Sequence, residues 1–99
     1  MAYTLAEIDN KVVGQYISGE ASFKITTPVA DTTESITLPG VHTITGIKSF
    51  VALDSGNNYA SDGADLTWSG NVLTIADGTG FDYSAMTTMW VTVFCLKYV

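Results

Sequence analysis

The C-terminal stretch from Thr87 to Val99 constrains the fold more than any other part of the chain. It is rich in β-branched and aromatic residues and contains no Gly, Pro or acidic residue, a composition that favours a pleated strand. One face of such a strand carries Trp90, Thr92, Phe94, Leu96 and Tyr98, and the other carries Met89, Val91, Val93, Cys95 and Val99. Because both faces are apolar, we expect the strand to be covered on both sides, either inside a sandwich or between a sheet and a neighbouring subunit.

The composition narrows the class of protein and of partner. A chain of 99 residues predicts one domain, and its 46% of apolar residues suggests that some apolar surface is buried against another chain. Four Lys, no Arg and ten acidic residues give a formal charge of -6. This balance argues against binding to nucleic acid or to an anionic membrane, both of which need a surplus of cations. A cationic or neutral protein surface is the more natural partner.

The single cysteine and the N-terminal residues indicate where the protein is made. Cys95 cannot form an internal disulfide, so a disulfide scaffold is excluded. The first residues lack the pattern of a signal peptide, and the C-terminal apolar run is too short for a membrane-spanning helix. We therefore expect a protein synthesised in a cytoplasm.

The N-terminal segment contains the pattern of a short helix. Thr4 and Glu7 fit a capping box, Leu5, Ile8 and Val12 follow at helical spacing, and Gly14 would end the helix. A helix of about two turns has to dock on another surface to persist. The alternative is a flexible arm, so the expected organisation is an arm or short helix over residues 1–14 and a β domain over residues 15–99.

The remainder of the chain reads as short strands separated by turns. Strands are expected over 21–27, 35–38 and 41–53, with Gly46 marking a bulge in the last of these. Residues 66–68 and 72–75 flank Ser69-Gly70-Asn71 and predict a hairpin. The pattern predicts an all-β protein, a single antiparallel β-sandwich of the jelly-roll-like or immunoglobulin-like kind.

The sequence contains no constellation for catalysis or for a cofactor. His42 is the one histidine and has no recognisable nucleophile partner, while Cys95 lies in the most apolar strand, where a thiol is unreactive. The glycines do not form a phosphate-binding loop. We therefore predict no enzyme, no catalytic residue, no cofactor and no metal ligand.

Two alternatives for small ligands remain open at this stage. The longest loop, from Asp54 to Asp65, gathers oxygen ligands that could bind calcium, although Asp and Asn are also ordinary loop residues. Tyr59, Trp68, Tyr83 and Trp90 could form a platform for a sugar, although aromatic residues in strands more often lie in the core.

Three segments together resemble a known family. They are Gly40-Val41-His42-Thr43-Ile44, Ser69-Gly70-Asn71-Val72-Leu73-Thr74-Ile75 and Met89-Trp90-Val91-Thr92-Val93. Over about the last 60 residues, the chain is similar to small all-β head decoration (cement) proteins of tailed bacteriophages. It departs from them in its end, Phe94-Cys95-Leu96-Lys97-Tyr98-Val99, where a short tail containing Gly is expected.

The resemblance implies a structural role in the virion. Proteins of this family sit on the outside of the capsid, bind the major capsid protein and associate with themselves as trimers or dimers. The corresponding interface here would use Leu5, Ile8, Val12, Trp90, Phe94 and Tyr98. The rival interpretation is a tail or fibre module that binds a carbohydrate.

Overall fold

The chain folds into seven strands and one short helical turn. The computed structural model describes residues 3–12, 18–26 and 32–96. The strands are β1 (Thr4–Val12), β2 (Ser18–Thr26), β3 (Thr33–Thr37), β4 (Thr43–Asp54), β5 (Asp65–Ser69), β6 (Val72–Ala76) and β7 (Met86–Leu96). A 3₁₀ turn, η1 (Tyr83–Ala85), precedes β7. No helix in the described part of the chain has the length and apolar content of a membrane span.

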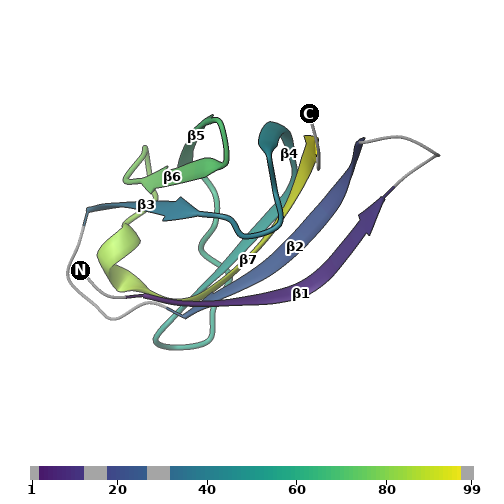
Figure 1. Ribbon diagram of the computed structural model, residues 1–99. Helices are drawn as coiled ribbons and strands as arrows, with labels where there is room; N and C mark the ends of the chain where they lie inside the picture. Colours follow the sequence, from purple (N-terminus) through teal and green to yellow (C-terminus); the bar gives the residue numbers. More distant parts are fainter. Residues whose placement is uncertain (1–2, 13–17, 27–31, 97–99) are drawn as a thin grey trace.

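The strands form two antiparallel sheets, which confirms the all-β prediction. The large sheet has the order β1-β2-β7-β4 and the small sheet the order β3-β6-β5. The small sheet lies over one face of the large sheet (Figure 1). Buried side chains of both sheets, such as Phe23 and Val91 from the large sheet and Leu73 and Ile75 from the small one, belong to one core. The fold therefore has two layers around a single core.

Strand β7 is central to the large sheet, as the composition of the C-terminal stretch predicts. It pairs with β2 on one side and with β4 on the other. Its buried side chains are Met86, Met89, Val91, Val93 and Cys95. The residues between them point to the opposite face, which no described part of the chain covers. We call this face of the large sheet the outer face.

The order of the strands differs from that of a constant-type immunoglobulin domain. In that domain the fifth strand lies between the second and the fourth, and the seventh strand lies beside the sixth. Here β7 lies between β2 and β4, and β5 lies beside β6, so the fifth and seventh strands have exchanged places. The chain accordingly crosses between the sheets four times, after β2, β3, β4 and β6.

The predicted hairpin is confirmed as β5 and β6. Their turn contains Gly70, whose φ of 59° is one that glycine adopts without steric cost. The turn also binds neighbouring segments, because the Leu38 amide donates to the Asn71 carbonyl at 2.9 Å and the Ile44 amide donates to the Gly70 carbonyl at 2.8 Å. The first bond ties the residue after β3 to this turn, and the second holds the start of β4 against the small sheet.

The predicted N-terminal helix is wrong. Residues Thr4–Val12 form β1, an edge strand paired with β2 along its length. The pairing is shifted by a bulge between Glu7 and Asp9, which places Ile8 in the irregular position. Strand pairing supplies backbone hydrogen bonds and lets Leu5 pack against the core, whereas an isolated two-turn helix has little stability of its own.

Candidate binding surface

The outer face of the large sheet carries a strip of apolar side chains over two of its four strands, β4 and β7. The register of these strands places Val51 beside Trp90 and Gly46 beside Phe94. Trp90 and Val51 are half-buried by their neighbours within the sheet, whereas Phe94 is 42% exposed. A strip of this kind, uncovered in the described structure, is typical of a surface that binds another macromolecule.

Phe94 lies next to a position that carries no side chain. A Cβ atom built on Gly46 would lie 3.5 Å from Cδ2 of Phe94, an ordinary van der Waals distance. The ring therefore covers the bare backbone of Gly46 on the adjacent strand. The sequence predicted a bulge at Gly46, and the register of β4 against β7 does shift between Ile44 and Gly46.

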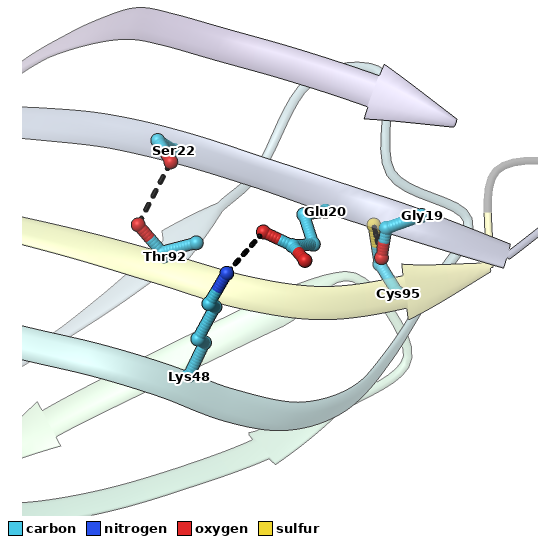
Figure 2. Close-up of polar contacts among 6 residues, drawn as sticks. All are labelled: Gly19, Glu20, Ser22, Lys48, Thr92 and Cys95. Atoms are coloured by element: carbon cyan, nitrogen blue, oxygen red, sulfur yellow. Dashed lines mark hydrogen bonds and ion pairs between the residues drawn. The ribbon is translucent and has the colours of Figure 1, made fainter. Parts of the chain in front are cut away.

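A polar belt crosses the strip at the level of Thr92. The hydroxyls of Ser22 and Thr92 form a hydrogen bond of 2.8 Å between β2 and β7. Close by, Nζ of Lys48 on β4 lies 3.0 Å from Oε1 of Glu20 on β2, so the ion pair reaches across β7 (Figure 2). The belt divides the strip into a patch around Trp90 and a patch around Phe94.

The loop after β4 adds one aromatic residue to this face. Tyr59 forms an isolated antiparallel bridge with Leu53, and residues opposite one another in such a bridge point to the same side. Leu53 in turn registers with Thr88 on the outer face. Tyr59 is 80% exposed, so it extends the apolar strip beyond the end of the sheet.

The position of Tyr59 is fixed by a tight turn. Oδ1 of Asp54 accepts hydrogen bonds from the amides of Gly56 at 2.9 Å and Asn58 at 3.0 Å. Asn57 has a φ of 60°, a conformation that Asn tolerates better than most residues. The amide of Ala60 donates to the carbonyl of Ala52 at 3.0 Å, which returns the chain to β4.

Charge is distributed unevenly between the outer face and the rest of the domain. Lys24 and Lys48, the two lysines whose side chains the structure describes, lie on the outer face, where Glu20 is paired with Lys48. The other acidic side chains that the structure describes belong to the inner register of the large sheet, to the small sheet or to loops. These are Glu7, Glu34, Asp54, Asp62, Asp65, Asp77 and Asp82.

The structure brings together only part of the interface that the sequence predicted. Trp90 and Phe94 share the outer face of β7, and Ile8 is 56% exposed on the edge strand β1. Leu5 is half-buried and packs against the core. The side chain of Val12 and the whole of Tyr98 lie outside the described residues.

Two groups of outer-face residues were not predicted as interface residues. Val51 and Leu53 have a signal in the sequence, because residues 50–53 are apolar without alternation, as in a strand with both faces covered. The pairing of Glu20 with Lys48 has no signal in the sequence, because the two residues are 28 positions apart and meet only through the strand order.

The aromatic platform proposed for a sugar is not assembled. Tyr83 is 1% exposed and belongs to the core. Trp68 lies on β5 of the small sheet, where it lines a shallow open pocket of about 260 Å³ with Leu66 and Thr67. Of the four aromatic residues, only Tyr59 and Trp90 lie on the outer face.

The structure also places the remaining candidate residues. His42 is exposed immediately before β4, and its Nδ1 lies 2.7 Å from the hydroxyl of Thr43. Cys95 is 2% exposed, with its sulfur 3.7 Å from the carbonyl of Gly19. Among the described residues, no three His, Cys, Asp or Glu side chains cluster as metal ligands would.

Comparisons of the chain with known protein families, with curated proteins and with solved structures find no match. The outer face and the resemblance of the three sequence segments are therefore the grounds on which a function can be proposed.

Proposed function

We propose that this chain is a non-enzymatic structural protein of a phage particle, which decorates the capsid and stabilises it by binding the major capsid protein and neighbouring subunits. The observation that carries the proposal is that Trp90 and Phe94 share an uncovered sheet face on an otherwise acidic domain. Aromatic residues in an apolar patch with few charges are typical of the centre of a protein interface. The protein would be made in the host cytoplasm and act on the capsid surface.

The architecture is compatible with this role. Two sheets around one core make a small rigid body, and we propose that the pair is a β-sandwich. A jelly-roll-like or immunoglobulin-like type belongs to the same proposal. The two-layer arrangement favours that type, whereas the exchanged places of β5 and β7 speak against the immunoglobulin order.

The contact with the shell is assigned to strand β1. It is the outermost strand of the large sheet, and Ile8 exposes an aliphatic side chain at its bulge. Each copy would need only a modest interface, because many copies on one shell bind with avidity. The outer face would then remain available for neighbouring subunits.

The number of copies in the particle tests the proposal. Quantitative mass spectrometry of gradient-purified virions gives the ratio of this chain to the major capsid protein, and decoration requires hundreds of copies per particle. A handful of copies would move the protein to the tail or a vertex. Complete absence from virions would overturn the proposal.

A variant of Ile8 tests the assigned contact. Ile8→Lys should abolish cosedimentation with heads that lack the protein, because a charge would replace an exposed apolar contact. The matched control is Thr67→Lys, an exposed strand position on the small sheet. Equal binding of both variants and the unmodified protein would show that β1 does not contact the shell.

A carbohydrate-binding module of a tail or fibre is the second candidate. It is favoured by the exposed phenol of Tyr59, since an exposed ring in a fixed turn can stack on a sugar. A glycan array distinguishes the two: binding that is lost in Tyr59→Ala supports the module, and an array without hits, together with high copy number, supports decoration.

A further inference from the structure

The outer face is a surface on which two copies of this acidic chain can meet without opposing carboxylates. Its described ionisable side chains are Lys24, Lys48 and Glu20, which sum to a charge of about +1 when all are ionised. The chain as a whole carries -6. Like charges placed opposite one another cost free energy, so self-association is favoured where the negative charge is lowest.

We propose that the outer face binds the outer face of a second copy, so that β7 of one copy stacks over β7 of the other. The inference rests on the proposed self-association and adds which surface is used and how the copies are oriented. A two-fold axis that runs along β7 places β4 of each copy over β2 of its partner. Lys48 of one copy then lies over Glu20 of the other, as it lies beside Glu20 within its own chain.

The shape of the sheet is compatible with this packing. Two identical faces have the same twist, and sheets of equal twist pack face to face with their strands about 30° apart. Phe94 and Trp90 project from the face, while Ser22 and Thr92 form a low belt between them. The axis along β7 places belt over belt, so Trp90 meets the partner's Trp90 and Phe94 meets the partner's Phe94, which would bury the two patches.

The area of the face is sufficient for a weak to moderate dimer. Four strands spaced by about 4.8 Å and about nine residues long, at about 3.3 Å per residue, span roughly 19 by 30 Å. That is roughly 600 Å² of flat area before the relief of the side chains is added, close to the value of about 800 Å² per partner in stable complexes.

Sedimentation of the purified protein tests the pairing. We expect the unmodified protein to form a dimer. Its dissociation constant should rise by about tenfold or more in Glu20→Lys, because the belts of the two copies then bring four lysines together. Lys48→Glu should have the same effect, because it brings four glutamates together. An equimolar mixture of the two variants should restore the dimer, because a basic belt then faces an acidic one. Asp62→Lys makes the same change of charge as Glu20→Lys on an exposed loop and should not weaken the dimer.

Three results would overturn the inference. The first is an unmodified protein that stays monomeric up to about 500 µM, a concentration at which only dimers weaker than about 5 kcal/mol escape detection. The second is an equal effect of Glu20→Lys and Asp62→Lys on the dissociation constant. The third is an equimolar mixture of Glu20→Lys and Lys48→Glu that stays monomeric. Each variant is first compared with the unmodified protein by circular dichroism and thermal melting.

A measurement on the unmodified sequence covers the case in which a variant fails to fold. Protein labelled with ¹⁵N is mixed with unlabelled protein and treated with a carbodiimide, which joins carboxylates to amines in contact. Cross-linked Glu20–Lys48 peptides should include pairs with one labelled and one unlabelled partner. If both partners always carry the same label, the contact is only intramolecular and the inference fails.

The outcomes also separate this inference from the proposed function. A monomer in solution that is abundant in virions would reject face-to-face pairing and leave decoration standing. A dimer through the outer face that is absent from virions would keep the pairing and reject decoration.

Discussion

Gly63 and Gly78 pack backbone against backbone, and neither position has room for a side chain. A Cβ atom on Gly63 would collide with the carbonyl oxygen of Thr79, and one on Gly78 would collide with the carbonyl oxygen of Gly63. Gly78 and Phe81 exchange backbone hydrogen bonds of 3.2 and 3.1 Å, which close the turn after β6. The contact joins the loop after β4 to the loop after β6, two of the four places where the chain crosses between the sheets.

Replacement of Gly78 by Ala should therefore destabilise the protein strongly. Gly78 does not have a positive φ, so the cost comes from the collision alone, and we expect about 2–3 kcal/mol. Gly80→Ala is the matched control, because Gly80 has a φ of 85° and open space around it, and its cost of about 1 kcal/mol comes from the backbone conformation. Urea denaturation gives both values. A larger loss in Gly80→Ala than in Gly78→Ala would contradict the contact.

The sequence predicted the central strand and the hairpin because local signals and tertiary packing agree there. The alternation in β7 gives Met89, Val91, Val93 and Cys95 to the core, as its spacing requires. The strand order could not be predicted in the same way. It depends on pairings such as β2 with β7, whose residues are about 70 positions apart, and no local pattern encodes them.

The error at the N-terminus has a specific cause in the bulge. Leu5 and Val12 are seven residues apart, a spacing that places them on one face of a helix but on opposite faces of a regular strand. The bulge at Ile8 inserts one residue, so that Leu5 registers with Ile25 and Val12 with Gly19, two positions on the same face of β2. A bulged strand can therefore reproduce the apolar spacing of a helix.

The candidate surface was predictable only where it depends on one strand. Trp90 and Phe94 follow from the alternation of β7, but Tyr59 joins them only through its bridge to Leu53. Leu5 packs against the core from the edge strand, a contact that its spacing in the sequence does not reveal. Residues brought together by strand order cannot be found from spacing in the sequence.

Gly46 should tolerate a methyl group despite its place at a bulge. The nearest atom to a Cβ there is Cδ2 of Phe94 at 3.5 Å, and the residue has no positive φ. Gly46→Ala should not lower the free energy of unfolding by more than about 0.5 kcal/mol. It can raise that free energy by up to about 1 kcal/mol, because alanine has less conformational freedom than glycine in the unfolded chain. Thermal melting measures the change. A loss of more than about 1 kcal/mol would mean that the bulge requires glycine.

Cys95 should be protected from thiol reagents in the folded protein. Its side chain is 2% exposed near the end of β7, between β2 and β4, so a reagent reaches it only when the sheet opens there. Ellman's reagent should label the folded protein several orders of magnitude more slowly than the protein in urea, where one thiol per chain reacts. Rapid labelling without urea would show that β7 separates readily from its neighbours.

Asp54 should stabilise the turn that presents Tyr59. Replacement by Ala removes the acceptor of the Gly56 and Asn58 amides, and we expect a loss of about 1–2 kcal/mol in the free energy of unfolding. Asp54→Asn keeps an oxygen acceptor and should lose less. Asp62→Ala changes an exposed carboxylate later in the same loop and should stay within about 0.5 kcal/mol of the unmodified protein. Hydrogen exchange at residues 55–60 should rise in Asp54→Ala and remain unchanged in Asp62→Ala. Equal exchange in the two variants would mean that the turn is held by its backbone bonds alone, such as that from the Asn57 amide to the Asp54 carbonyl at 3.0 Å.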